Sequence, residues 1–121
     1  MQKIFLVEDD PFLVDIYSTK FKKLGYEVAS TPGGEEIISR IKTEKPSIVV
    51  LDIVLPNIDG WEILKRIRSD EELKDLKVII LSNLGQEEEV KKGIELGATK
   101  YLIKAHLNPS EVIEEIRKTL Q

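Results

Sequence analysis

One carboxylate stands out by its position. Asp52 directly follows the unbroken apolar run at residues 48–51, and a turn with Pro, Asn and Asp-Gly comes after it. An apolar run of this length, rich in β-branched residues, is typical of a parallel strand covered by helices on both faces. An acid at the carboxyl end of such a strand lies where open α/β sheets bind ligands. Asp52 is therefore the first candidate for chemistry.

Other polar side chains follow further apolar runs. Glu8 and Asp9 follow the first run of the chain, Ser82 follows a later one, and Lys104 follows the last. Because parallel strands end at the same edge of a sheet, we expect these groups to lie close to Asp52. Carboxylates that lie close together repel, so the site needs raised pKa values or a cation. Oxygen ligands alone favour a hard ion, Mg²⁺ before Ca²⁺.

A site of this composition is suited to phosphoryl transfer. A carboxylate can attack a phosphoryl group and form an acyl phosphate, while Mg²⁺ and a lysine offset the charge on the transferring oxygens. Asp52 is the predicted acceptor, and Lys104 is the predicted fixed positive charge. The Ser82 hydroxyl would then donate a hydrogen bond to the new phosphoryl group and draw its loop inward. Modification of Asp52 would thereby become a conformational signal.

The elements that must position these side chains alternate along the chain. Short apolar runs predict five strands, at residues 3–7, 27–30, 47–51, 77–81 and 101–103. Apolar residues at helical spacing predict five helices, at residues 11–24, 35–43, 61–69, 87–96 and 109–120. In the first helix, Asp10 is the predicted N-cap, Leu24 continues the apolar pattern, and Gly25 is the predicted C-cap. The alternation predicts an α/β fold with a doubly wound parallel sheet and right-handed crossovers.

Composition limits the remaining classes of protein. A length of 121 residues suits one domain, and 41% hydrophobic with 33% charged residues is typical of a soluble globular protein. No tract is long and apolar enough to cross a bilayer, and no secretory signal precedes the first strand, so we expect a cytoplasmic protein without a membrane partner. A net charge of -4 argues against direct nucleic-acid binding. The absence of Cys excludes disulfides and thiolate metal sites.

Several dispersed motifs occur in a fixed order. They are Ile4-Phe5-Leu6-Val7-Glu8-Asp9-Asp10, Leu51-Asp52-Ile53-Val54-Leu55-Pro56-Asn57-Ile58-Asp59-Gly60, Leu81-Ser82, Gly97-Ala98 and Tyr101-Leu102-Ile103-Lys104. In this order and spacing, the chain resembles the receiver domain of two-component response regulators over essentially its full length. The resemblance implies that residues 1–121 form one receiver domain. It also implies a flavodoxin-like fold of five strands and five helices, with strand order 2-1-3-4-5.

The resemblance also implies roles for individual residues. For the metal, it implies an acidic pocket of Glu8 and Asp9, with Asp52 and the backbone carbonyl of Val54 as further ligands of Mg²⁺. For the phosphoryl group, it implies Asp52 as the phosphoacceptor and Lys104 as the phosphate-facing lysine. For the switch, it implies the hydroxyl of Ser82 and the aromatic ring of Tyr101. The family's phosphodonor is a sensor histidine kinase. The expected function is phosphorelay signal transduction, in which a histidine kinase or a small phosphodonor modifies Asp52.

The same resemblance implies how the signal leaves the domain. Phosphorylation is expected to switch partner binding at the face formed by the fourth helix, the fifth strand and the fifth helix. Because the chain stops after the fifth helix, we expect it to act through a downstream protein partner or a separate output domain. It is expected to catalyse only its own phosphorylation and dephosphorylation, and thus not to be an enzyme in the usual sense. A phosphorylation-dependent homodimer stays open.

Two departures from the family pattern keep a second interpretation open. Ala105 follows the lysine, where relatives usually have Pro, and Asn83 follows the hydroxyl, where a small residue is common. A receiver-like module that binds partners without being phosphorylated is therefore an alternative. A third interpretation is a phosphatase with an aspartate nucleophile, which also uses a strand-end Asp, Mg²⁺ and Lys. Such enzymes carry Asp-x-Asp at the nucleophile, whereas this chain has Val54 at the second position.

Overall fold

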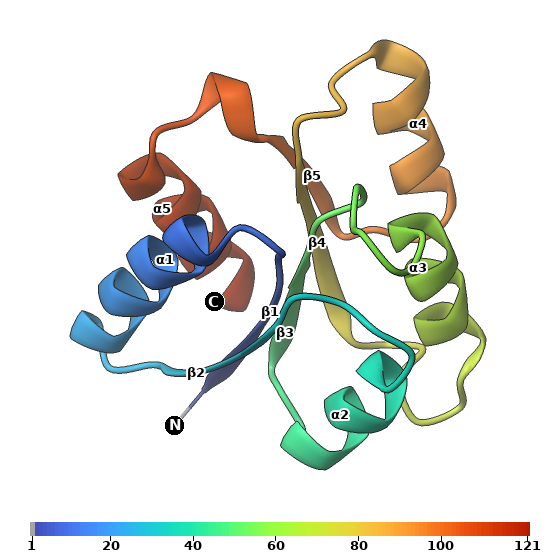
Figure 1. The fold of residues 1–121 in the computed structure, drawn as a ribbon, viewed down its shortest axis with the longest axis horizontal. Coiled ribbons are helices and arrows are strands. Elements are labelled where there is room, and N and C mark those ends of the chain that lie inside the picture. The colour runs from blue at the N-terminus through green and yellow to red at the C-terminus, as the bar shows by residue number, and fades with distance from the viewer. Residues whose placement is uncertain (1) are drawn as a thin grey trace.

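The structure, a computed structural model, describes residues 2–121. Strands alternate with helices along the chain (Figure 1). The elements are β1 (Lys3–Val7), α1 (Pro11–Lys23), β2 (Glu27–Thr31), α2 (Ile37–Glu44), β3 (Ile48–Leu51), α3 (Gly60–Ser69), β4 (Lys77–Ser82), α4 (Glu87–Glu95), β5 (Lys100–Ile103), the short 3₁₀ helix η1 (Lys104–His106) and α5 (Pro109–Leu120). The five strands pair in parallel in the order β2-β1-β3-β4-β5, which confirms the predicted strand order.

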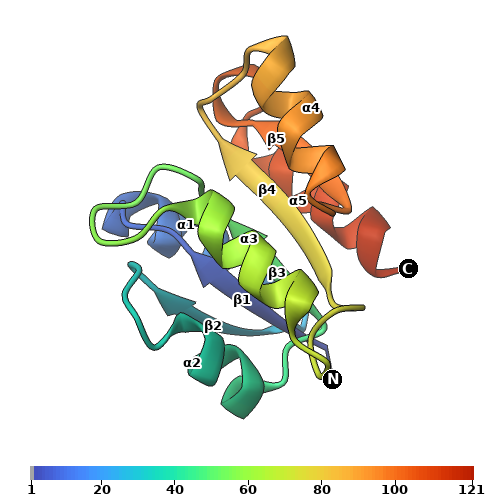
Figure 2. The ribbon, with the colours of Figure 1, turned by 90° about the vertical axis from the view of Figure 1, so that its right-hand side faces the viewer.

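Helices cover both faces of this sheet. In Figure 1, α1 and α5 lie on one face, and Figure 2 shows α3 on the other face between α2 and α4. Successive strand residues point to opposite faces, so β1 sends Phe5 and Val7 into one apolar core and Ile4 and Leu6 into the other. The sheet is thus clamped between two cores, as the two-sided apolar runs predicted.

Side-chain caps fix where the helices begin. The Asp10 carboxylate accepts a hydrogen bond from the Phe12 N–H at 2.9 Å, which confirms Asp10 as the N-cap of α1. Asp59 caps α3 in the same way by accepting from the Trp61 N–H at 3.0 Å. In this part of the molecule, the cap sets the direction in which the chain leaves the sheet edge.

The predicted end of the first helix is wrong by one residue. Helix α1 ends at Lys23 with Leu24 as its C-cap, and Gly25 follows with φ +92°. Leu24 lies beyond the last regular turn, where the helical period no longer directs it toward the sheet, and it is 54% exposed. The second helix also starts later than predicted, at Ile37, because residues 35–36 form a turn. Among the described residues, no helix has both the length and the apolarity needed to cross a membrane.

Candidate functional site

The strand ends bring the predicted polar residues to one edge of the sheet. Strands β1, β3, β4 and β5 are consecutive neighbours, so the residues that follow them are neighbours too. They line a cavity of about 380 Å³, whose walls are Glu8, Asp9, Asp10, Leu13, Asp52, Val54, Ser82, Asn83 and Lys104. Every predicted site residue except Tyr101 therefore lies at this cavity, and Tyr101 belongs to the adjoining β5.

Lys104 joins two buried carboxylates. Its Nζ lies 2.5 Å from Glu8 Oε1 and 2.8 Å from Asp52 Oδ2, and both acids are only 6% exposed. Burial raises the pKa of Glu8, although the hydrogen bond from Lys104 opposes that change. Burial by itself would lower the pKa of Lys104, but hydrogen bonds to Asp52 and Glu8 outweigh it and the pKa is raised. The lysine is thus held as a cation between the two acids.

Backbone N–H groups engage the remaining oxygen of each buried acid. Val54 N–H donates to Asp52 Oδ1 at 3.2 Å, and Asp10 N–H donates to Glu8 Oε2 at 3.1 Å. The orientation of the Asp52 carboxylate is therefore fixed on one side by Lys104 and on the other by the loop that follows β3. These contacts hold the carboxylate in one orientation at the wall of the cavity.

The acidic residues fit a hard divalent cation. Glu8, Asp9 and Asp52 each offer one carboxylate oxygen, and these oxygens lie within 4.8 Å of one another. Such a spacing suits an ion with short bonds to oxygen, and a set of oxygen ligands favours Mg²⁺ or Ca²⁺ over softer metals. Asp9 is exposed, so the ion would keep a side open to water or substrate. The role of the Val54 carbonyl as a further ligand stays a prediction.

The peptide at Leu84 links the two residues with predicted switch roles. Ser82 is completely buried, and its Oγ accepts a hydrogen bond from Leu84 N–H at 3.3 Å. The Tyr101 hydroxyl donates to the Leu84 carbonyl at 2.5 Å. Burial, with smaller contributions from Glu89 and Asp52, raises the pKa of Tyr101 to about 12. Sequence reasoning missed this link through the Leu84 peptide, because it is made by backbone atoms that carry no sequence signature.

The two departures from the family pattern have modest structural consequences. No cis peptide bond occurs in residues 2–121, and Ala105 forms part of η1 directly after Lys104. Asn83 is exposed and lines the cavity, and Tyr101 still reaches Leu84 beside it. Neither residue prevents the side chains from converging.

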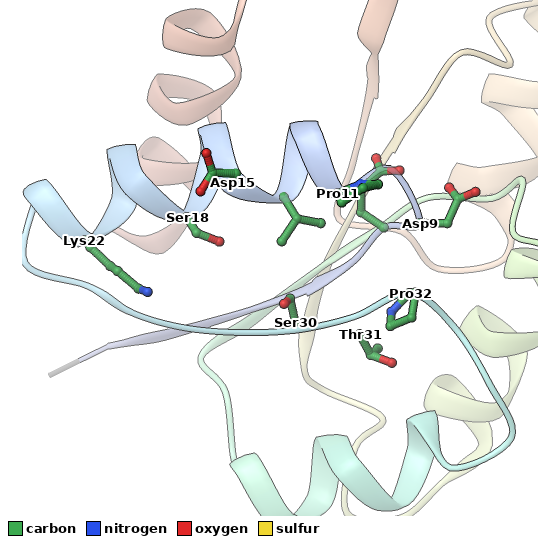
Figure 3. Close-up of a pocket in the computed structure, with 10 residues that line it drawn as sticks. Asp9, Pro11, Asp15, Ser18, Lys22, Ser30, Thr31 and Pro32 are labelled. Atoms are coloured by element: carbon green, nitrogen blue, oxygen red, sulfur yellow. The ribbon is translucent and has the colours of Figure 1, made fainter.

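A larger cavity of about 490 Å³ adjoins the first. Figure 3 shows it between α1 and the end of β2, with Asp9 at one end and Lys22 at the other. Glu8 and Asp9 line both cavities, but Asp52 and Lys104 line only the first. Only the smaller cavity therefore brings Asp52 and Lys104 together with Glu8 and Asp9.

Comparisons with known proteins agree with this geometry. The model of the response regulator receiver domain family matches residues 4–117. The alkaline phosphatase synthesis transcriptional regulatory protein PhoP of Bacillus subtilis is 34% identical over 122 residues, which cover 99% of this chain and 49% of PhoP. The chain spans about half the length of the curated relatives that it matches.

Solved structures of response regulators and their receiver domains have a similar fold. The BeF3-activated N-terminal receiver domain of Klebsiella pneumoniae RstA superposes with a TM-score of 0.89 and 28% identity, over 99% of both chains. The response regulator DrrB of Thermotoga maritima gives a TM-score of 0.85 and 33% identity, over 99% of this chain and 52% of DrrB.

Proposed function

The chain belongs to the response regulator receiver domain family, and from this premise we propose that Asp52 is the residue that accepts a phosphoryl group in a two-component phosphorelay. The observation that carries the proposal is the position of the Asp52 carboxylate, 2.8 Å from the Lys104 ammonium and beside two further acids. A nucleophile, a fixed cation and an acidic pocket are what transfer to a carboxylate requires.

In the proposed reaction, an Asp52 carboxylate oxygen attacks the phosphorus of a phosphohistidine on the partner kinase or of a small acyl phosphate. The new P–O bond forms as the bond to the leaving group breaks, and its electron pair stays on the leaving nitrogen or oxygen. Lys104 would move from the Asp52 carboxylate to an oxygen of the transferred group. Mg²⁺ held by Glu8, Asp9, Asp52 and the Val54 carbonyl would offset negative charge on the transferring oxygens.

The proposed switch begins at Ser82. Its Oγ already accepts the Leu84 N–H, so its own proton can be donated to an oxygen of the phosphorylated Asp52. Any movement of Ser82 would shift the Leu84 peptide, to which the Tyr101 hydroxyl is bound. The signal would thereby reach the face formed by α4, β5 and α5 and change which partner binds there.

Partners follow from the same proposal. A sensor histidine kinase would supply the phosphoryl group, and an output domain or a separate protein would receive the signal, since the named relatives are transcriptional regulators about twice as long as this chain. The chain would catalyse only its own phosphorylation and dephosphorylation, in the cytoplasm, and would need no contact with nucleic acid in this domain. A phosphorylation-dependent homodimer is compatible with either kind of output.

Intact-mass measurement tests the proposal directly. The protein is incubated with acetyl phosphate and Mg²⁺, and the expected result is the gain of one phosphoryl group, which stops at that stoichiometry and is absent from Asp52→Asn. Binding of BeF3⁻ with Mg²⁺, the ligand named for the RstA relative, gives a second measurement. A protein that takes up no phosphoryl group and binds no BeF3⁻ would instead be a module that signals by binding alone. Repeated hydrolysis of a small phosphomonoester would favour the phosphatase interpretation.

A further inference from the structure

Helix α3 begins in direct contact with the peptide of the proposed phosphoacceptor. Gly60, its first residue, donates its N–H to the Ile53 carbonyl at 3.0 Å. A Cβ placed on Gly60 would lie 2.5 Å from Ile53 Cα and 2.7 Å from the Asp52 carbonyl oxygen. These contacts close the loop at residues 53–59 into a ring whose two ends touch beside Asp52.

Gly60 is needed here for space and not for its backbone angle. The glycines with positive φ in the described chain are Gly25, Gly33, Gly34 and Gly97, and Gly60 has no such angle. The atoms that a Cβ would meet are backbone atoms, which cannot turn aside as the end of a side chain can. A side chain at position 60 must therefore push the start of α3 away from the Asp52–Ile53 peptide.

Of the chain on either side of Asp52, only the downstream loop can move together with the start of α3. Upstream of Asp52, strand β3 is completely buried and paired on both sides, so it cannot shift with the loop. Downstream, the Val54 N–H that holds Asp52 Oδ1 lies one residue beyond the contact with Gly60. The strain would thus fall on the Asp52 carboxylate and on the N–H that orients it.

We propose that Gly60 is a positioning residue for phosphoryl transfer, which acts by pressing the start of α3 against the Asp52–Ile53 peptide and so aims the Asp52 carboxylate. This inference rests on the proposed function, because it assumes that Asp52 is the acceptor. Reaction rates depend steeply on the position and orientation of the attacking atom, and a misplacement of about 1 Å can lower the rate roughly 100-fold. Gly60 is not among the residues that line the cavity at Asp52, so its proposed effect on the reaction passes through Asp52.

The test compares Gly60→Ala with Asp59→Ala. The second variant removes the cap of the same helix but adds no atom at the contact, so it weakens α3 without displacing Asp52. Initial rates of phosphorylation by acetyl phosphate are measured over a range of Mg²⁺ concentrations and divided by the folded fraction from circular dichroism. At saturating Mg²⁺, we expect Gly60→Ala to be slower than wild type by at least about tenfold, and Asp59→Ala to stay within about twofold.

Mg²⁺ dependence separates positioning from a merely structural role. Asp52 and the Val54 carbonyl are proposed Mg²⁺ ligands and lie at the strained loop, so the Mg²⁺ concentration for half-maximal rate should also rise in Gly60→Ala. In Asp59→Ala it should stay near the wild-type value. A normal maximal rate per folded molecule in Gly60→Ala, or an equal loss in Asp59→Ala, would overturn the inference.

A destabilised Gly60→Ala variant is measured in the cold with sucrose, which favours the compact state. Failure to fold even there would also overturn the inference, since Gly60 would then be a requirement of the fold as a whole. If wild type itself is not phosphorylated, the proposed function fails, and the result says nothing against the contact at Gly60. The two failures are therefore distinguishable.

Discussion

At the scale of single residues, the site holds buried charges that destabilise the fold. Glu8 and Asp52 are both buried, and one lysine serves them both. Burial of ions costs free energy that ion pairing repays only in part. The raised pKa of Glu8 is the mark of that cost, because the folded protein binds a proton at Glu8 more readily than the unfolded chain does.

Removing the charge of Glu8 should therefore stabilise the protein and weaken the site. When folding raises the pKa of a carboxyl, the folded protein loses stability as the pH rises from the ordinary pKa of 4.5 to the raised pKa. At neutral pH, the ionised Glu8 side chain therefore destabilises the fold. We expect Glu8→Gln to raise the free energy of unfolding at pH 7 in chelator. Urea unfolding measures this, with the surface variant Glu27→Gln as control.

Addition of Mg²⁺ should reverse the order of the two proteins. An ion that binds only the folded state stabilises it by mass action, and wild type has one more acidic ligand than Glu8→Gln. Wild type should thus gain more stability from Mg²⁺ than the variant does. Equal gains would mean that Glu8 takes no part in binding the ion.

At the scale of elements, the sequence predicts contacts that depend on chain order and misses those that depend on packing distance. Strands and strand-end residues were predictable, because a two-sided apolar run fixes a buried parallel strand and all such strands end at one edge. Asp52 and Lys104 meet for that reason, although 52 residues separate them. The prediction that the first helix extends to Leu24 was wrong, because helical spacing predicts which face is apolar but not the turn at which the helix ends.

Close approaches between elements leave no pattern in the sequence. In the sequence, Gly60 indicates only a turn before a helix and Gly93 an ordinary helix position, yet at each a neighbouring segment leaves no room for a Cβ. The link through the Leu84 peptide also leaves no pattern in the sequence, because the carbonyl of any residue could accept the hydrogen bond from the Tyr101 hydroxyl. These features come from the distances between layers, which periodicity does not report.

Of the five α-helices, α4 has the fewest buried residues. Gly93 is its one buried residue among those described, and Ile94 is 49% exposed. A Cβ at Gly93 would lie 2.7 Å from the Tyr101 ring and 2.8 Å from the end of the Ile80 side chain. The helix can therefore approach β5 only because position 93 has no side chain, and the place of the Tyr101 ring depends on that approach.

Gly93→Ala should move the Tyr101 ring and loosen its hydrogen bond to Leu84. The added methyl group overpacks the contact, at a cost of about 1–3 kcal/mol, while the better helix propensity of Ala returns about 1 kcal/mol. As the ring becomes more exposed, the pKa of Tyr101 should fall from about 12 toward its ordinary value of 10.0. Absorbance at alkaline pH follows tyrosine ionisation, with Tyr101→Phe to assign the transition. Lys91→Ala, on the exposed side of α4, should leave it in place.

At the scale of the whole molecule, the protein pairs one costly buried cluster with many favourable surface ion pairs. The pKa of each of four carboxyls is lowered by hydrogen bonds from cationic neighbours, namely Glu44 beside Lys3 and Arg40, Asp70 beside Lys42, Glu114 beside Arg117, and Glu115 beside Lys100. Each pair is partly exposed and contributes little alone. Together they oppose the effect of Glu8, whose pKa is shifted the other way.

Stability should therefore pass through a maximum on the acid side of neutrality when Mg²⁺ is absent. As pH falls from neutral, Glu8 takes up a proton in the folded state first, because its pKa is raised, and stability increases. Below about pH 4.5, the four carboxyls with lowered pKa values lose charge in the unfolded chain and then in the folded protein, so their contribution to stability disappears.

Urea midpoints measured across this pH range test both the increase and the decrease in stability. In Glu8→Gln, stability should not increase as the pH falls from neutral, but it should still decrease below about pH 4.5. High salt should make that decrease smaller, because salt screens exposed ion pairs more than buried ones. A midpoint that only decreases from pH 7 downward in wild type would show that the ionised Glu8 is not a burden on the folded state.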